Sequence, residues 1–307
     1  MAAFNLTILG SNSAVPAHNR YPSSQVLRCN QMGILIDCGE GAQFQMNKFH
    51  IKRGGLDYIL ISHMHGDHYF GLVGLLNSFK LNNRQHAIHI YGPPELEPII
   101  SLQTNYKDSN WPYPLHFYPI RMEEVYTLFE TEELIVSTIP LKHKIACNGF
   151  LIREKLKARK ILAEAIRAYE IPNHAIKAIK NGEDFIQANG DVIHNGLLTA
   201  NPPDSFAYAY CSDTLYDETI VPHIKGVDVL YHEATFGEES RDKAALRFHS
   251  TAKQAANIAK KAGVGQLIIG HYSAKYKDLS PLLLEAQEIF PATVLAKEGS
   301  NYSIPND

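Results

Sequence analysis

The 307-residue sequence has little of what marks secreted or membrane proteins. It holds only four cysteines and no Cys-x-x-Cys pair, which favours a reducing compartment over a disulfide-stapled secreted fold. It also lacks a basic leader and any apolar stretch near the roughly 18 residues of a membrane span. The formal net charge of −3 supplies no overall positive field. We therefore expect a cytoplasmic protein with no membrane or DNA partner, in which any contact with nucleic acid is local.

Short runs rich in branched and aromatic residues recur along the chain and predict strands. These runs are Phe4–Leu9, Gly33–Asp37, Tyr58–Ile61, Leu134–Ile139, Val227–Tyr231 and Gln266–Ile269. Between some of them lie helical patterns, the clearest being Thr251–Ala262, whose alanines fall on one face and for which Ser250 is the predicted N-cap. The order is not a simple alternation of strand and helix, so we expect an α/β fold with sheets in the middle and helices outside.

The segment 151–200 differs from the rest of the chain. Lys155–Lys180 predicts two helices broken at Ile171-Pro172-Asn173, and Asn189-Gly190 predicts a turn. Between Leu151 and Lys180 the chain has three glutamates and eight basic residues, a local net charge of +5, so the rest of the chain has a net charge of −8. The basic residues are Arg153, Lys155, Lys157, Arg159, Lys160, Arg167, Lys177 and Lys180. Such a cluster can steer phosphate to one part of an acidic protein, although a solvated helix surface explains it equally well.

The run His63-Met64-His65-Gly66-Asp67-His68 follows an apolar strand and carries the strongest chemical signal. Gly66 allows a tight turn in which four side chains converge. Imidazole and carboxylate ligands favour zinc over magnesium or calcium. Because a catalytic zinc takes about three protein ligands, four ligands within this run predict two adjacent metals. A set of polar loop histidines is the weaker alternative.

A two-metal site needs more ligands, and three candidates follow predicted strands. His143 comes after Ile139, Asp213 after the run Tyr208–Cys211, and His271 after Ile269. Taken singly, either histidine could be a satisfied structural residue, and Asp213 could cap a turn.

Several longer stretches carry a resemblance to a known family. They are Leu6–Gly10 with Pro22-Ser23-Ser24, Ile36–Gly41, Ile61–Leu72, Ser212-Asp213-Thr214, His232–Phe236, His249–Ala252 and Gly270–Tyr276. Together they resemble the metallo-β-lactamase superfamily and, within it, ribonuclease Z, an endonuclease that removes 3′ trailers from precursor tRNA. The resemblance covers nearly the whole chain. It implies one metallo-β-lactamase-like domain over 1–307, a four-layer αββα sandwich, with residues 151–200 inserted as a projecting helical arm that contacts tRNA.

The resemblance also implies roles for individual residues. His63, His65 and His143 would hold one zinc, Asp67, His68 and His271 a second, and Asp213 would bridge the two. Asp67 would also be the general base, and His249, supported by Glu233, would protonate the leaving oxygen. Without the resemblance, His249 could simply precede the helix and Glu233 could lie on a surface loop. His232 is left out, because adjacent positions at a strand end point to opposite faces.

The resemblance implies precursor tRNA as substrate and a homodimer as the assembly. One departure concerns the arm, where the family commonly has a Gly-Pro-rich element and this chain has Ile171-Pro172-Asn173-His174. The altered arm and the negative net charge keep a second hypothesis open, a hydrolase of small phosphodiesters on the same scaffold. A third, a binding protein without catalysis, is disfavoured by the intact ligand set.

Overall fold

The structure is a computed structural model that describes residues 4–107, 110–202 and 205–304. The chain divides into two compact units. The first, here called the body, comprises Met1–Thr131, Ile135–Ile152 and Phe206–Asp307, and the second, the insert, comprises Glu132–Leu134 and Arg153–Ser205. Each unit is described by itself.

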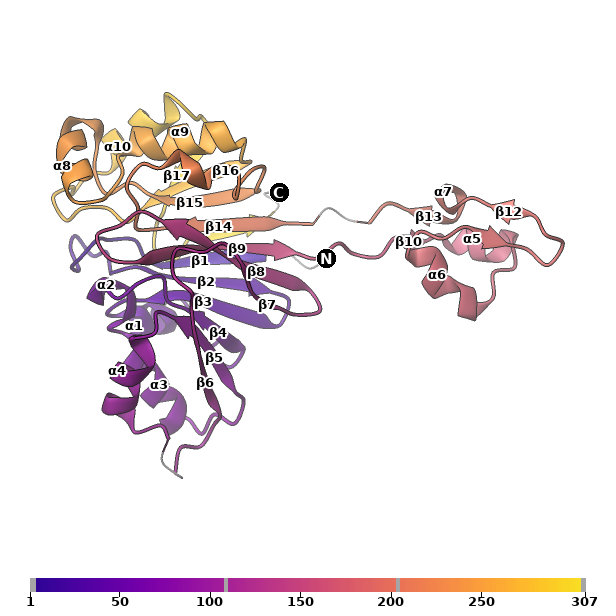
Figure 1. Cartoon of the computed structure of the whole chain (residues 1–307), viewed down its shortest axis with the longest axis horizontal. Coiled ribbons are helices and arrows are strands. Elements are labelled where there is room, and N and C mark those ends of the chain that lie inside the picture. The colour runs from indigo at the N-terminus through magenta and orange to yellow at the C-terminus, as the bar shows by residue number, and fades with distance from the viewer. Residues whose placement is uncertain (1–3, 108–109, 203–204, 305–307) are drawn as a thin grey trace. The chain divides into compact units, whose positions relative to one another are not determined.

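The body is built on two seven-stranded sheets (Figure 1). The first has the order β18 (Asn301–Ile304), β1 (Phe4–Gly10), β2 (Ser24–Cys29), β3 (Met32–Cys38), β4 (Leu56–Leu60), β5 (Ile88–Gly92) and β6 (Leu115–Pro119). The second has the order β17 (Thr293–Leu295), β16 (Gln266–Gly270), β15 (Val229–Glu233), β14 (Ala207–Cys211), β9 (Cys147–Glu154), β8 (Leu134–Leu141) and β7 (Thr127–Glu130). Strands β3 to β6 run parallel to one another, as do β14 to β17, while β2 pairs antiparallel with β3. All six predicted strands are confirmed, with shifts of at most two residues at their ends.

Helices cover the outer faces of both sheets (Figure 1). On the first sheet lie α1 (Ala42–Lys48), α3 (Leu72–Leu81) and α4 (Leu96–Thr104), and on the second lie α8 (Arg241–Leu246), α9 (Ala252–Ala262) and α10 (Ser280–Gln287). The short elements of the body are α2 (Gly66–Tyr69) and the 3₁₀ turns η2 (Glu218–Ile220) and η3 (Glu238–Ser240). The predicted αββα sandwich is confirmed for the body.

The parallel strands form because their apolar runs are buried on both faces, as central strands between helix layers must be. In β3, Ile34, Leu35 and Ile36 are at most 1% exposed. Helix α9 buries its alanine face as predicted. Its N-cap is Thr251 rather than Ser250, because Thr251 and Gln254 form a reciprocal capping box while the buried Ser250 hydroxyl donates to the Thr214 carbonyl at 2.8 Å.

The insert has a small apolar core around Ala165, Ile171, Ile179 and Leu198. Its elements are β10 (Lys160–Ile161), α5 (Ala163–Ala168), η1 (Asn173–Ala175), α6 (Ile176–Lys180), β11 (Phe185–Ile186), β12 (Val192–Ile193), α7 (Asn195–Leu198) and β13 (Thr199–Ala200). The break near Pro172 and the turn at Gly190, with φ of 90°, are confirmed. Two helices lie within the predicted range, but the first begins at Ala163 and not near Lys155, because Lys160–Ile161 form β10 and pair with β13.

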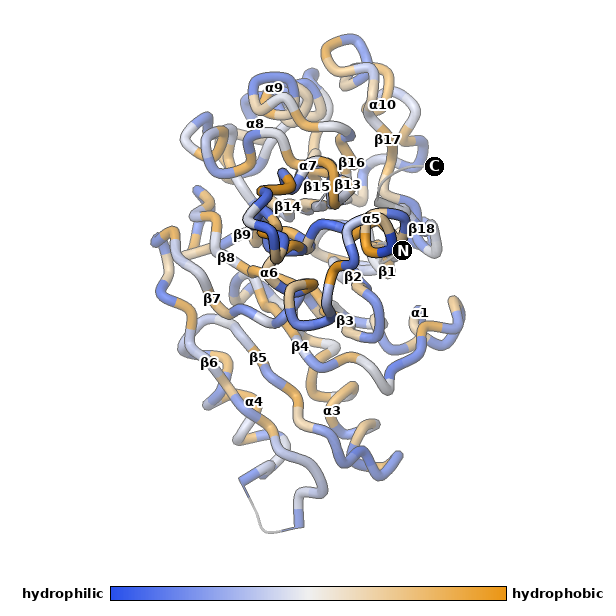
Figure 2. Tube along the Cα trace, turned by 90° about the vertical axis from the view of Figure 1, so that its right-hand side faces the viewer, coloured by the Kyte–Doolittle hydropathy of each residue, from blue (hydrophilic) through white to orange (hydrophobic). Residues whose placement is uncertain are grey.

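Across the described residues, no helix is both long and apolar enough to cross a membrane. In Figure 2, hydrophobic residues alternate with hydrophilic ones along the helices. That alternation is typical of helices with one face on a core and one in water.

Candidate metal centre

The histidine run lies where β4 leaves the first sheet. His63 and His68 are fully buried, and α2 begins at Gly66. Gly66 has no positive φ, and a Cβ at this position would meet the Phe70 ring at 2.1 Å. The glycine therefore leaves room for that ring beside the turn into α2.

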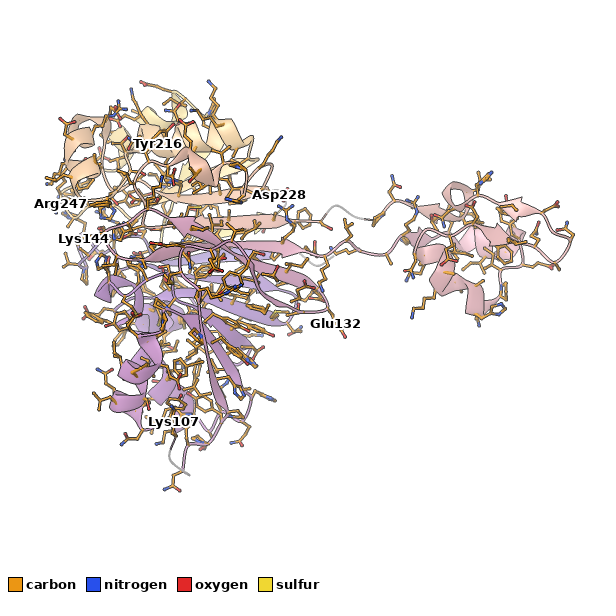
Figure 3. The ribbon with its side chains drawn as sticks, in the orientation of Figure 1. Lys107, Glu132, Lys144, Tyr216, Asp228 and Arg247 are labelled. Carbon is orange, nitrogen blue, oxygen red and sulfur yellow. The ribbon has the colours of Figure 1, made fainter. Side chains whose placement is uncertain are left out.

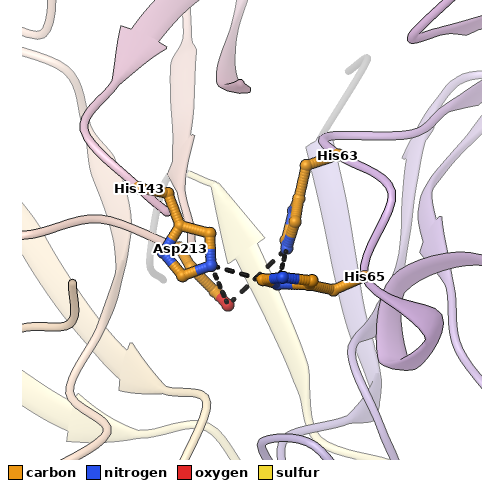
Figure 4. Close-up of side chains that lie close together, drawn as sticks. All are labelled: His63, His65, His143 and Asp213. Carbon is orange, nitrogen blue, oxygen red and sulfur yellow. Dashed lines mark hydrogen bonds and ion pairs between the residues drawn. The ribbon is translucent and has the colours of Figure 1, made fainter. Parts of the chain in front are cut away.

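One group of nitrogen atoms converges beside Asp213 (Figure 4). His65 Nδ1 lies 3.0 Å from His63 Nε2 and 3.1 Å from His143 Nε2. Both Nε2 atoms lie 3.8 Å from Asp213 Oδ2. These four side chains come from the ends of β4, β8 and β14, so the two sheets meet at this cluster.

A second group meets the other oxygen of the same carboxylate. Asp213 Oδ1 lies 3.1 Å from His271 Nε2 and 3.5 Å from His68 Nε2. The Asp67 Oδ2 atom lies 3.4 Å from His271 Nε2 and 3.6 Å from His68 Nε2. Asp213 thus stands between two ligand groups and offers one oxygen to each.

The donor chemistry fits a metal at this cluster. His68 Nε2 is buried and has no hydrogen-bond partner among the described residues, while its Nδ1 is bound to Asp37 Oδ2 at 2.7 Å. His143 Nδ1 donates to the Phe248 carbonyl at 2.9 Å. His271 Nδ1 donates to the Thr235 hydroxyl at 2.9 Å, because that hydroxyl itself donates to Glu233. With Nδ1 as the donor, each ring presents an Nε2 lone pair to the cluster.

The electrostatics put most of these groups in the form that binds a cation. Burial lowers the pKa of His63 well below its usual value, and burial also lowers the pKa of His65 and of His143. Burial alone would raise the pKa of Asp213, but His271 and His68 hold it well below its usual value. Neutral imidazoles beside ionised carboxylates are the ligand states that borderline divalent metals prefer.

Asp37 supports the cluster from behind, a role that the sequence reading missed. Its carboxylate accepts from the backbone nitrogen of Ser62 at 2.8 Å, from the Ser62 hydroxyl at 2.9 Å and from the Tyr210 hydroxyl at 2.7 Å, as well as from His68. The only signal in the sequence is a carboxylate that ends an apolar strand. Since these partners fix the ring of His68, Asp37 is a positioning residue.

We expect Asp37→Asn to weaken metal binding by about 10- to 100-fold, because the amide cannot accept all four donors and His68 loses its fixed orientation. Competition with a chromophoric chelator measures the change. Asp57→Asn is the matched control, since Asp57 is a partly exposed carboxylate that pairs with Arg84 at 2.9 Å. Equal metal affinity in the Asp37→Asn and Asp57→Asn proteins would contradict the positioning role.

Beside the cluster, His249 is paired with a buried carboxylate. Its Nδ1 lies 2.8 Å from Glu233 Oε1, and Glu233 is fully buried at the end of β15. Burial alone would lower the pKa of His249, but Glu233 raises it to about 9. The alternative of Glu233 as a surface-loop residue is therefore wrong. His232 joins neither ligand group, as expected, and its Nδ1 hydrogen bonds to the Glu233 carbonyl.

A cavity of about 530 Å³ opens onto the centre. Its walls include His65, Asp67, Asp213 and His249, together with the loop at Ser13–Pro16 and the Phe70 ring. The Ala14 backbone nitrogen donates to Asp67 Oδ2 at 2.7 Å. Ligand groups, a protonated imidazole and open space therefore meet at one place, the arrangement of a hydrolytic centre.

The αββα body and the histidine–aspartate cluster at the ends of its strands define a metal-dependent hydrolase of the metallo-β-lactamase fold. Comparison with known proteins supports this class. The family model described as "Anti-Pycsar protein Apyc1" matches residues 4–159. The chain is also similar to the human tRNase Z short form, at 25% identity and a TM-score of 0.70 over 98% of this chain and 100% of that one.

Relatives that match the full length narrow the class. Ribonuclease Z of Bacteroides fragilis is 43% identical over 97% of this chain and 98% of its own. Ribonuclease Z of Cytophaga hutchinsonii is 44% identical over 98% of this chain and 96% of its own. The chain belongs to the ribonuclease Z family along its length. Its residues 4–159 also belong to the family described as "Anti-Pycsar protein Apyc1".

Proposed function

We propose that the chain is a zinc-dependent endoribonuclease that removes the 3′ trailer from precursor tRNA. The observation that carries the proposal is Asp213, whose two oxygens face two separate ligand groups in a chain that belongs to the ribonuclease Z family. In the proposed assignment, His63, His65 and His143 would hold one zinc, Asp67, His68 and His271 would hold the other, and Asp213 would serve both groups. Nitrogen and oxygen donors in this number suit two zinc ions.

A metal pair held here would supply an activated water near neutral pH and offset the charge on the scissile phosphate. The protein's own groups supply the rest. Asp67, held by the Ala14 backbone nitrogen, takes the proton of the attacking water. His249 is protonated at neutral pH and gives its proton to the leaving oxygen, while Glu233 orients the ring and keeps it charged.

Glu233 sets the pH range in which His249 is protonated and can act as the acid. The raised pKa keeps His249 protonated below that pKa, and the acid is lost as the pH rises through it. We expect Glu233→Gln to move the alkaline limb of kcat/KM to lower pH, because the neutral amide no longer stabilises the imidazolium. The measurement is a pH profile on precursor tRNA under single-turnover conditions. An unmoved alkaline limb would assign that limb to another group.

The deciding experiment for the function is cleavage of a precursor tRNA followed by mapping of the new ends. A cut directly after the discriminator nucleotide, leaving a 3′ hydroxyl on the tRNA, supports the proposal. The second candidate function, hydrolysis of small phosphodiesters, predicts turnover of bis(4-nitrophenyl) phosphate at least as efficient as that of tRNA. Cuts away from the tRNA 3′ end would sink the assignment.

We further propose that the insert contacts tRNA phosphates. Four of the eight predicted basic residues, Arg153, Lys160, Arg167 and Lys177, are exposed. Lys157 instead pairs with Glu154 at 2.6 Å, and the Arg159 side chain donates to Thr199. The insert's own core and the network around Asn195 give these cations a defined support. Phosphate contacts of this kind position a substrate without reading its sequence.

We expect the triple substitution Lys160→Ala, Arg167→Ala and Lys177→Ala to lower kcat/KM on precursor tRNA and to flatten its salt dependence. Each lost phosphate contact removes about 0.7 to 0.9 from the slope of log affinity against log salt. Cleavage rates between about 50 and 200 mM salt measure this slope. The ratio of tRNA cleavage to small-diester hydrolysis should fall in parallel, and an unchanged ratio would remove the insert from substrate binding.

A homodimer and a cytoplasmic location complete the proposal. All four cysteines are buried free thiols, which supports a reducing compartment. Light scattering on the purified chain tests the dimer.

A further inference from the structure

A second cavity, of about 500 Å³, lies on the other side of His143. Its walls include Phe248, Ile145 and Leu215, with Lys142, Lys144 and Glu123. Cavities of several hundred cubic ångströms with apolar walls and a few polar groups are typical of small-ligand sites. The ligand should therefore combine a flat apolar part with negative charge.

The cavity and the metal centre share His143, and a hydrogen bond joins that residue to the Phe248 wall of the cavity. The Phe248 carbonyl accepts from His143 Nδ1 at 2.9 Å, and the His143 ring lies 5.1 Å from that of His249. Phe248 also immediately precedes His249 in the chain. A group bound against Phe248 is thus next to the residue proposed to protonate the leaving oxygen.

Phe248 is held in a conformation that folding alone does not favour. Its φ is 59°, in the left-handed region that a bulky residue rarely adopts, and 39% of the residue is exposed. Among the described residues, no other aromatic ring packs on it. An exposed ring held this way beside a reaction centre is suited to stacking on a base.

The two lysines at the cavity differ in whether a carboxylate already pairs with them. Lys142 pairs with Asp217 at 3.2 Å, whereas no carboxylate in the described part of the chain lies within 4.0 Å of the Lys144 ammonium group. Lys144 and Arg247 are both labelled at the same end of the body in Figure 3. Glu123 can accept a hydrogen bond from the exocyclic amino group of a base. These groups complement a nucleotide, with a stacked base and a phosphate at Lys144.

Resting on the proposed function, we propose that this cavity binds the discriminator nucleotide, the one that carries the leaving 3′ oxygen, with its base stacked on Phe248 and its own 5′ phosphate near Lys144. His249, which also lines the first cavity, donates to that leaving oxygen. It directly follows Phe248 in the chain and its ring lies 5.1 Å from that of His143, so a nucleotide attached to the leaving oxygen can reach the second cavity. The cavity at Asp67 and Phe70 is then left for the trailer.

The test pairs protein variants with a precursor tRNA that is abasic at this nucleotide. Base stacking predicts that Phe248→Ala lowers kcat/KM on the intact precursor by roughly 5- to 150-fold. Replacing the intact precursor by the abasic one should lower kcat/KM of the wild type by a similar factor. The same replacement should lower kcat/KM of Phe248→Ala little further. Phe248→Tyr, which keeps the ring, should restore most of the activity.

Two further variants separate the ring from the backbone. Phe248→Asn keeps a residue that tolerates the left-handed region and removes the ring, so it should behave as Phe248→Ala does. Leu246→Ala, at an 81% exposed position of the same segment, should leave both substrates unaffected. If the losses in kcat/KM caused by Phe248→Ala and by the abasic nucleotide multiply fully when the two changes are combined, the proposal is overturned. Correct 3′ cleavage by the wild type would still uphold the proposed function.

Discussion

His249→Ala should lower kcat on precursor tRNA by about 10²- to 10⁴-fold while leaving the bound metal unchanged. The imidazole is held by Glu233 through Nδ1 at 2.8 Å, and it is the acid in the proposed mechanism. His249 also lies near Asp213 and His271 in a third possible ligand group. We assign it to proton transfer because the buried Glu233 carboxylate holds its Nδ1 and raises its pKa to about 9, so the ring carries a proton to donate at neutral pH.

The loss of activity in His249→Ala should depend on the leaving group of the substrate. A diester with a nitrophenolate leaving group needs little protonation, so the loss on bis(4-nitrophenyl) phosphate should be much smaller than on tRNA. His223→Ala, at an exposed histidine, is the matched control. Metal content is measured by elemental analysis of the purified variants. Loss of metal in His249→Ala, or equal losses on both substrates, would refute the role of proton donor.

Much of the body could be predicted from sequence because its central strands are buried on both faces. Runs such as Ile34-Leu35-Ile36 are continuously apolar and therefore visible without any alternation. Strands β2 and β5 were missed, since Gln25, Arg28 and His89 interrupt their apolar character. The two-residue strands of the insert carry too little pattern to be recognised, and the pairing of Lys160 with Ala200 depends on residues 40 positions apart.

The candidate site shows the same division between local and distant information. His63–His68 is visible because its members are contiguous, whereas His143, Asp213 and His271 are brought to it only by the meeting of the two sheets. Their positions after strands give a hint, and the resemblance supplied the rest. Asp37 and Thr235 escaped notice because what they do depends on burial and on partners 31 and 36 residues away, His68 and His271.

Asp213→Ala should lower both metal binding and activity, because it acts on both ligand groups at once. Each of its oxygens lies within 3.8 Å of a different pair of histidine nitrogens. Without the carboxylate, each metal loses one ligand, and the negative charge that offsets two adjacent cations is gone. The metal contribution to catalysis is several kcal/mol, so we expect activity to fall on the order of 10³-fold or more.

Metal content and stability distinguish this result from simple misfolding. In the metal-free protein, Asp213 is an ionised carboxylate buried among histidines, so its removal leaves the His68 cation with less compensation. The variant should therefore bind less than half the metal of the wild type and gain little thermal stability when zinc is added. Asp242→Ala, at an exposed position of α8, should retain the full zinc-dependent rise in melting temperature. A folded Asp213→Ala protein with unchanged metal content would show that the two groups do not share this carboxylate.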